Sequence, residues 1–442
     1  MRTMARLAVV VGVLWGDGSA QQGATSCSLP APFDVGAAYA REIYVAPDGI
    51  DTADGSRGAP LRTIRAAADR ATPGTRVNVA TGTYPPVALG RVQGEATRPI
   101  AFVARGAVTI EARSGAGWAM SDPAYVVIEG FTIRNTAAHG MNVDDGGTFD
   151  SPAHHLVLRR LTITRAGSGG NHDCIKLSGV DDFWILESDV SGCDRGEIID
   201  MVGCHRGVIS GNVFHDTVAS GVQAKGGSAD ILIHGNRFEN IPSRAVNAGG
   251  STGLPYFRPI DAPHEAARIR VLSNVFVRNG QQGGAAVAYV GCDACVFAHN
   301  TVIEPRRWVA RILQETTDPR FVRSRRGLFV NNLVVFAERD LSTIVNVGAN
   351  TSPESFTFGS NAWFATDRAA WPGPVLGSGI PGESGSLVQR DPQLVDLAGG
   401  NYRPRPASPL VGTARPLEFT LPPDFDGRCQ PVPATIGAFT AP

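Results

Sequence analysis

A short phrase recurs along this chain with its asparagine in register. Each copy has alternating apolar residues around a one- or two-residue polar turn, and the first two copies place Asn212 and Asn236 about 24 residues apart. The copies are GVISGNVF at 207–214, DILIHGNRF at 230–238, RIRVLSNVF at 268–276, CVFAHNTV at 295–302 and GLFVNNLVV at 327–335. One strand–turn–strand unit per copy is typical of a solenoid. A single unit cannot bury its apolar side alone, so the units must stack.

The solenoid that we predict is all-β: a right-handed parallel β-helix with two or three short strands in each coil. Val208, Leu232 and Val271 should point into the bore, with their neighbours facing solvent. Asparagine tolerates left-handed backbone geometry, and stacked amides can hydrogen-bond from coil to coil. A β-sandwich is the alternative, but hairpin dipeptides are few and the recurrence is longer than a sandwich strand spacing.

The N-terminus has the pattern of a signal peptide over residues 1–20. A basic start is followed by a short apolar stretch, Leu7–Trp15, and by small residues suitable for cleavage. The apolar stretch is too short to span a bilayer, and no later segment is a candidate. We therefore expect a secreted or periplasmic protein without a membrane span.

The mature chain divides by composition into four parts. We expect a leader, an N-terminal cap with a helix near Pro60–Ala71 that covers the first coil, the coils themselves, and a Pro/Gly-rich cap and tail. Their ranges are 21–41, 42–90, 91–350 and 351–442. All seven cysteines lie in the mature chain, so at least one of them is unpaired or bridges to another chain. Cys292 and Cys295 are expected to form a local disulfide or to pack a turn as thiols.

The charge balance excludes some partners. The net charge is −1 and only 18% of residues are charged, so the sequence gives no sign of a nucleic-acid or anionic-membrane partner. We expect a monomer, because a solenoid builds its core along one axis within a single chain.

A polar strip is predicted on strands that precede the asparagine phrases. The segments HDCIKLSG (172–179), GEIIDMVG (196–203), SGVQAKGG (220–227) and SRAVNAGG (243–250) align on their terminal glycines. This alignment puts Lys176, Asp200 and Gln223 in one column, with Lys225 beside it at the turn. Coils stack about 4.8 Å apart, so these side chains should converge. Asp173, Glu197 and Asn247 should lie on or near the same surface.

The lysines of this strip suggest a chemistry. Lys176 and Lys225 are the only lysines, and the other 38 basic residues are arginines. β-Elimination from a uronate needs a neutralised carboxylate and a base, and a lysine whose pKa is lowered can be that base. We expect Lys225 to be the base and Lys176 to bind the carboxylate. The structural alternative is that Lys176 forms an inter-coil salt bridge with Asp200 and Lys225 caps a turn.

Further side chains are candidates for binding the substrate. A long polar loop, 249–267, carries Tyr256 as a possible stacking platform and Arg258 as a possible carboxylate clamp. The same loop could instead cover the flank of the helix. The other substrate-binding candidates are Arg195, His205, Gln223, Arg244 and Asn247. A second charged stretch, Glu304–Trp308 with Gln314–Glu315, lies downstream and could extend the same face.

Both ends of the mature chain resemble a known group. The opening YVAPDG…APLRTIRAAADRATPGTRVNVATGTY and the closing DPQLVD…GGNYRPRPASPLVGTA are similar to those of secreted β-helix proteins of the pectate-lyase-like superfamily. The resemblance implies a polysaccharide-handling scaffold and leaves the reaction open. Among enzymes of this group it resembles the family-nine pectate lyases, which use a lysine base and Ca²⁺ held by aspartates.

That resemblance implies a possible Ca²⁺ site. Its ligands would come from Asp173, Asp200 and Asp194 or Glu197, and an arginine could neutralise the substrate instead. The predicted function is cleavage of an acidic, uronate-containing polysaccharide by an exported lyase. The alternatives are a non-catalytic β-helix that binds or displays glycan, and a glycoside hydrolase on the same scaffold.

Overall fold

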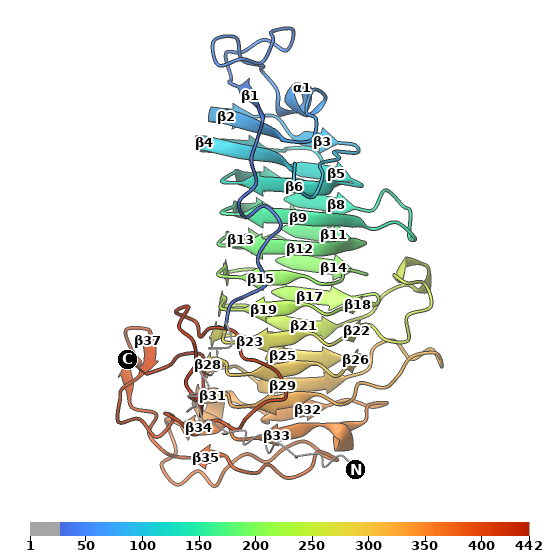
Figure 1. Cartoon of the computed structure of the whole chain (residues 1–442). Helices are drawn as coiled ribbons and strands as arrows, with labels where there is room; N and C mark the ends of the chain where they lie inside the picture. The colour runs from blue at the N-terminus through green and yellow to red at the C-terminus, as the bar shows by residue number, and fades with distance from the viewer. Residues whose placement is uncertain (1–26, 442) are drawn as a thin grey trace, which may run out of the picture.

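A computed structural model describes residues 27–441, so the predicted signal peptide lies outside the described residues. These residues wind into a long right-handed parallel β-helix whose strands stack in columns (Figure 1). The predicted fold is confirmed. No helix in the described range is long and apolar enough to cross a membrane.

One sheet carries the predicted polar strip, and we call it the ten-stranded sheet. Its strands pair in parallel in the order β3-β5-β8-β11-β14-β17-β21-β25-β29-β32. Their bounds are β3 Val87–Leu89, β5 Trp118–Ser121, β8 Met141–Asp144, β11 Ile175–Ser178, β14 Ile199–Val202, β17 Val222–Lys225, β21 Val246–Gly249, β25 Ala285–Val290, β29 Trp308–Leu313 and β32 Val345–Val347.

The other walls of the coils form a second, larger sheet with two columns of strands. The first column comprises β1 Arg41–Val45, β2 Thr75–Tyr84, β4 Ile100–Glu111, β6 Ala124–Glu129, β9 Ala153–Arg159, β12 Val180–Leu186, β15 Val208–Ser210, β19 Leu232–His234, β23 Arg270–Leu272, β27 Val296–Ala298, β30 Leu328–Val330 and β33 Thr357–Gly359. The second comprises β7 Thr132–Thr136, β10 Thr162–Ala166, β13 Asp189–Cys193, β16 Val213–His215, β20 Arg237–Glu239, β24 Val275–Val277, β28 Thr301–Ile303, β31 Leu333–Phe336, β34 Ala362–Ala365 and β35 Leu387–Val388. Parallel pairing therefore continues past residue 350, where the coils were expected to end.

Smaller elements complete the chain. Short strands at the turns are β18 Ser228–Ala229, β22 Ala266–Ala267 and β26 Cys292–Asp293, and an antiparallel pair in the tail is β36 Leu394–Asp396 and β37 Asn401–Pro404. The helical segments are α1 Ile64–Ala68, η1 Leu254–Tyr256, η2 Glu338–Asp340 and η3 Pro353–Ser355.

A buried asparagine ladder joins successive coils. The Nδ2 of Asn212 donates to the Oδ1 of Asn236 at 2.9 Å, and Asn236 donates in the same way to Asn274 at 3.0 Å. The ladder continues through Asn300, Asn332 and Asn361. Each amide also donates to a backbone carbonyl of the preceding coil, as Asn236 does to Ile209. The six side chains are at most 1% exposed, so the predicted stacking of Asn212 and Asn236 is confirmed.

The left-handed residue of each turn precedes the asparagine, which corrects the expectation that the asparagine itself takes that conformation. Positive φ angles occur at Gly211, Gly235, Ser273, His299 and Asn331. The asparagines recur at one position of successive turns, where their amides pair with the next coil and their own φ angles are not positive.

Two of the predicted bore residues face outward. Strand register aligns Ile209 with Ile233 and Val271, and these three point into the core. Val208 and Leu232 occupy the alternate positions on the outer face. The apolar pattern misled the prediction because both faces of this strand column are covered.

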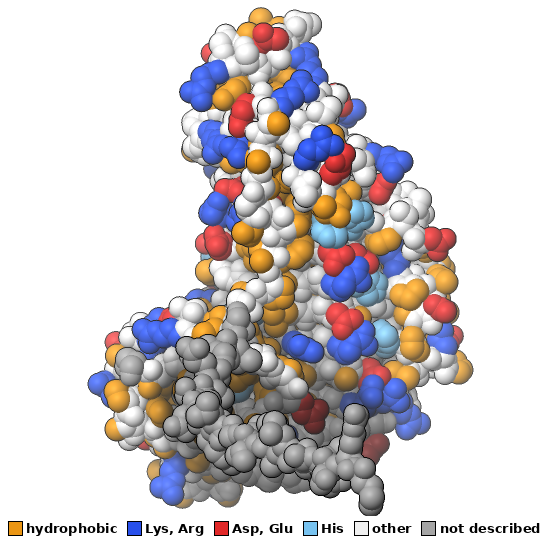
Figure 2. Space-filling view, viewed as in Figure 1, with side chains coloured by type: hydrophobic (Ala, Val, Ile, Leu, Met, Phe, Trp, Pro, Cys, Tyr) orange, Lys and Arg blue, Asp and Glu red, His pale blue; other side chains and the backbone are white. Residues whose placement is uncertain are grey.

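The outer cover comes from the two ends of the described chain. Phe33 and Tyr39 of the leader pack on one part of the outer face, and Leu417 and Phe419 of the tail pack on the next part. Figure 1 shows the leader running lengthwise over the coils, and Figure 2 shows apolar side chains gathered in a band on this face. A disulfide between Cys27 and Cys429 joins leader to tail.

The N-terminal end of the core is closed by α1 (Figure 1). Thr63 caps the helix by accepting from the Ala66 amide, and Ile64 and Ala67 are buried against the first strands. The helix is shorter than the predicted range of Pro60–Ala71, yet it covers the open end of the sheet as expected.

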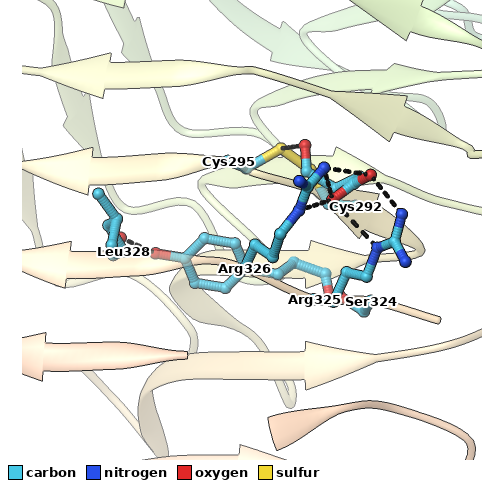
Figure 3. The surroundings of a disulfide bond; sticks show 8 residues. Cys292, Cys295, Ser324, Arg325, Arg326 and Leu328 are labelled. Carbon is cyan, nitrogen blue, oxygen red and sulfur yellow. Dashed lines mark hydrogen bonds and ion pairs between the residues drawn. A yellow bond between two sulfur atoms is a disulfide. The ribbon is translucent and has the colours of Figure 1, made fainter. Parts of the chain in front are cut away.

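Two further disulfides lie within the coils. They join Cys174 to Cys193 and Cys292 to Cys295, which leaves Cys204 as the buried free thiol among the described residues. At the second bridge, Arg325 and Arg326 both bond the carboxylate of Asp293 (Figure 3). Of the two alternatives expected for Cys292 and Cys295, the structure has the local disulfide.

Replacing a central ladder residue should destabilise the coils. Asn236→Ala leaves the Asn212 amide donors without their acceptor inside the core, and an unsatisfied buried group costs about 1–3 kcal/mol. We expect a clearly lower thermal midpoint by circular dichroism. The control is the exposed Asn171→Ala, which should leave the midpoint nearly unchanged. Equal midpoints for the two variants would contradict a stabilising ladder.

Candidate functional site

The predicted polar column exists on the outward face of the ten-stranded sheet. Strand register places Lys176 opposite Asp200, Asp200 opposite Gln223 and Gln223 opposite Asn247. Lys225 is two residues after Gln223 on β17, so it lies on the same face at the next outward position. The glycine alignment of the sequence therefore gave the right column.

Asp200 is the centre of this column. Lys176 Nζ bonds one carboxylate oxygen, while Lys225 Nζ lies 3.3 Å from the other and Gln223 Nε2 donates to it at 3.0 Å. The Gln223 side chain in turn accepts from Asn247 Nδ2 at 2.6 Å. The Asp200 side chain is 5% exposed and each lysine side chain 19%. Two lysine side chains thus share one nearly buried carboxylate.

The electrostatics of the column favour charged groups. Burial opposes ionisation of Asp200, but Lys176 and Lys225 outweigh it, and the pKa of this carboxyl is lowered. Burial likewise opposes the charge of Lys176, but Asp200 outweighs it and the pKa of Lys176 is raised. Lys176 is therefore a cation at neutral pH. Lys225 adds a second basic side chain at the same carboxylate.

A second acidic group lies beside Lys176. Asp173 is 4% exposed, and its Oδ1 accepts from the backbone N–H of Glu197 at 2.9 Å. Burial and then the charge of Asp200 raise the pKa of Asp173 to about 8, so this carboxyl is protonated at neutral pH. Its own backbone N–H donates to His139 Nδ1 at 2.9 Å.

The imidazole of His139 is neutral. Burial, with the nearby His172 and Lys176, lowers its pKa to about 4. The two rings lie edge to face with centroids 4.8 Å apart. The contact of 3.6 Å between His139 and the Asp173 carboxyl is therefore no ion pair at neutral pH.

The carboxyls proposed as calcium ligands do not fit a calcium site as they are arranged. Both oxygens of Asp200 are engaged by cations or an amide, and the Asp173 carboxyl is protonated at neutral pH. Within residues 27–441 no group of three or more carboxyl, imidazole or thiol side chains is placed to hold a metal ion. Asp194 is exposed and Glu197 half-buried. Calcium binding stays a prediction, and we derive no step through a metal.

The long loop is anchored at its base and exposed at its tip. Arg258 is 8% exposed and forms a bidentate pair with Asp145, so it is committed to holding the loop rather than free to clamp a substrate. The Glu265 carboxylate accepts from the Gly226 and Thr252 amides. Tyr256, in contrast, is 62% exposed. Arg258 therefore fits the alternative in which the loop covers the flank of the helix, while Tyr256 is exposed and available for binding.

The other predicted binding residues occupy different places. Arg195 is exposed before β14. Both ring nitrogens of His205 are engaged in its turn, one 2.7 Å from Asp181 and the other 3.2 Å from the Gly227 carbonyl oxygen. Arg244 belongs to the strip, because it donates to Asn247 at 3.1 Å and to Glu315 at 2.6 Å.

Sequence reasoning missed three residues of this face. Asn142 and Arg311 occupy the same column on β8 and β29, and His139 lies in the turn before β8. Extending the alignment by one strand, to MNVDD at 141–145, would have found Asn142. Nothing in the sequence marks His139, because its partner Asp173 comes from the next coil.

The structure also has a cleft on another face. It has a volume of about 470 Å³ and lies between leader and tail, with Trp184, Arg206, Arg270 and Phe419 in its lining. None of the polar column lines it. The candidate site is therefore identified by the polar side chains that converge on Asp200, and not by an enclosed cavity.

Asp173 should make stability depend on pH. Its pKa in the folded protein is about 8 against 3.8 for the free group, so folding favours the protonated form. This stabilisation is complete below the free pKa and is lost as pH rises towards 8. Asp173→Asn removes the titration, so the thermal midpoint of the wild type should fall relative to that of the variant between about pH 4 and about pH 8. Parallel pH profiles would contradict this, and the exposed Asp261→Asn is the control.

Comparisons with known proteins agree with this fold. Residues 114–314 match the family described as the right-handed β-helix region. A stretch of 69 residues is 39% identical to pectate lyase PEL9 of Emericella nidulans, but it covers only 16% of this chain and 17% of that protein.

Two solved structures are similar over nearly the whole chain. Pectate lyase Pel9A has a TM-score of 0.58 at 14% identity, covering 92% of this chain and 98% of its own. XylC in complex with xylose has a TM-score of 0.54 at 11% identity, covering 90% and 98%. At such identities the likeness concerns the fold. The chain thus has the right-handed parallel β-helix fold that these proteins share.

Proposed function

We propose that the protein is an exported lyase that cleaves an acidic, uronate-containing polysaccharide by β-elimination. The observation that carries this proposal is the pair of lysines that meet at one buried carboxylate on the outward face of a polysaccharide-lyase-like scaffold. The partial sequence match to a pectate lyase supports the same class of substrate.

The charge of the lysine pair favours an acidic ligand. Lys176 remains a cation beside Asp200, and its charge can also attract a substrate carboxylate. Pairing a uronate carboxylate with a cation makes the adjacent C5 proton more acidic, which is the first requirement of β-elimination. Gln223 and Asn247 are 7% and 1% exposed and continue the column as a chain of hydrogen bonds that holds Asp200 in place.

The geometry separates the roles of the two lysines. Lys176 is held as a cation by Asp200, which suits it to bind the substrate carboxylate. Lys225 contacts the other oxygen at 3.3 Å and lies at the end of its strand. In the proposed reaction Lys225, as the neutral amine, takes the C5 proton, the electron pair of the C5–H bond forms the C4–C5 double bond, and the C4–O bond breaks. Water protonates the leaving oxygen.

Export is part of the proposal. The three disulfides suit an oxidising compartment, in agreement with the signal peptide expected from the sequence. A secreted or periplasmic location would give the protein access to polymeric glycans.

Conservative replacement of each lysine should test the assignment. Lys225→Arg keeps the charge but removes a usable base, because arginine stays protonated, and should lower kcat by about a hundredfold or more. Lys176→Arg should mainly raise KM. The assay follows ultraviolet absorbance of unsaturated product from polygalacturonate, alginate and glycosaminoglycans. Arg326→Lys, which changes an exposed cation on another turn, is the control.

Other outcomes would assign another function. Full turnover in both lysine variants would remove the lysines from the chemistry. Saturated reducing ends in place of unsaturated product would indicate a glycoside hydrolase. Binding of these polymers without any cleavage would indicate a non-catalytic glycan-binding β-helix.

A further inference from the structure

A second group of cations lies on the same face, further along the ten-stranded sheet. Arg311 on β29 follows Asn247 and Ala288 in the column of the lysine site. Three rungs separate β29 from Lys225 on β17, which corresponds to roughly 14 Å at the spacing of stacked coils. The second charged stretch of the sequence therefore lies in line with the lysine pair.

Arg311 is fixed by contacts on several sides. Its Nε donates to Asn346 Oδ1 at 2.9 Å, and its Nη1 donates to the Gly283 carbonyl oxygen at 3.0 Å. Its guanidinium carbon lies 4.3 Å from the ring centroid of Trp308, and that of Arg307 lies 4.5 Å from the same ring. Cation–π contacts hold both guanidinium groups without neutralising them.

This group has more positive than negative charge. Arg244 pairs with Glu315 at 2.6 Å, whereas neither Arg307 nor Arg311 forms an ion pair in residues 27–441. Burial, together with Arg244 and Arg307, lowers the pKa of Arg311 to about 10, although Glu315 opposes the shift. Three cations gathered around one carboxylate repel one another, and a bound anion would relieve that repulsion.

The surface next to Arg311 is hollowed. A depression of about 580 Å³ is lined by Asn346, which accepts the Arg311 hydrogen bond, and by Thr343 and Thr351. It lies on β32, one rung beyond Arg311. A sugar ring whose carboxylate met the arginines would therefore have space and polar partners beside it.

We propose that Arg311 and Arg307, held by Trp308 and assisted by Arg244, form a second binding subsite for a carboxylate of an acidic polysaccharide. The subsite rests on the proposed function, because it would bind the same polymer that the lysines cleave. A chain lying along the sheet would contact both groups at once. The protein should therefore act better on long polymers than on short oligomers.

The test compares substrates of different length. Arg311→Gln and Trp308→Ala should lower kcat/KM for polygalacturonate by about tenfold relative to its trimer, because each variant loses a charge-assisted contact that only the longer chain makes. The loss should appear in KM. The control is Arg326→Gln, an exposed arginine on another turn, which should leave the ratio unchanged. An unchanged ratio in a folded Arg311→Gln protein, checked by circular dichroism, would overturn the subsite.

A direct binding measurement separates this proposal from the reaction. In affinity electrophoresis through polygalacturonate or alginate, Arg311→Gln should be retarded less than the wild type, and fully methyl-esterified pectin should retard neither. This holds even if the protein shows no lyase activity, in which case the reaction fails and the subsite stands. Equal retardation of Arg311→Gln and wild type, or no retardation of the wild type by either polymer, would overturn the subsite.

Discussion

The hydrogen bond from one asparagine amide to the next fixes how the coils stack. Each amide of the ladder joins three coils, because it donates forward to the next asparagine and back to a carbonyl of the preceding coil. These groups are buried, so a shift of register by one residue would leave them unsatisfied. Apolar side chains alone would tolerate such a shift more easily. The ladder therefore specifies the register that all other columns share.

A fixed register turns distant residues into neighbours. Lys176, Asp200 and Gln223 lie on consecutive rungs because each is at the same position of its own coil. The ladder lies in the turns between the two strand columns of the larger sheet, and the polar column lies on the ten-stranded sheet. The same stacking that satisfies the amides therefore also brings two lysine side chains to one carboxylate. Arg311 is aligned with them by the same rule, although two further rungs intervene.

Sequence reasoning succeeded where a feature repeats within the coils and failed where it depends on contacts outside them. The asparagine phrase predicted the fold, and terminal glycines predicted the lysine column. The orientation of Val208 and Leu232 was wrong because the leader and tail, which the repeat does not describe, cover the outer face. The ion pair of Arg258 could not be predicted from the sequence, because its partner Asp145 belongs to a loop several coils away.

The use of lysine at only two positions has a physical reason in this structure. Elsewhere, arginines make planar bidentate pairs between turns, as Arg206 does with Asp182 and Arg268 with Asp230. Asp200 cannot form two such bidentate pairs, because it also accepts a hydrogen bond from Gln223 within a nearly buried column. A compact ammonium group can share the carboxylate, and it can also lose its proton, which a guanidinium does not. The site thus replaces a rigid structural cation with one that suits acid–base chemistry.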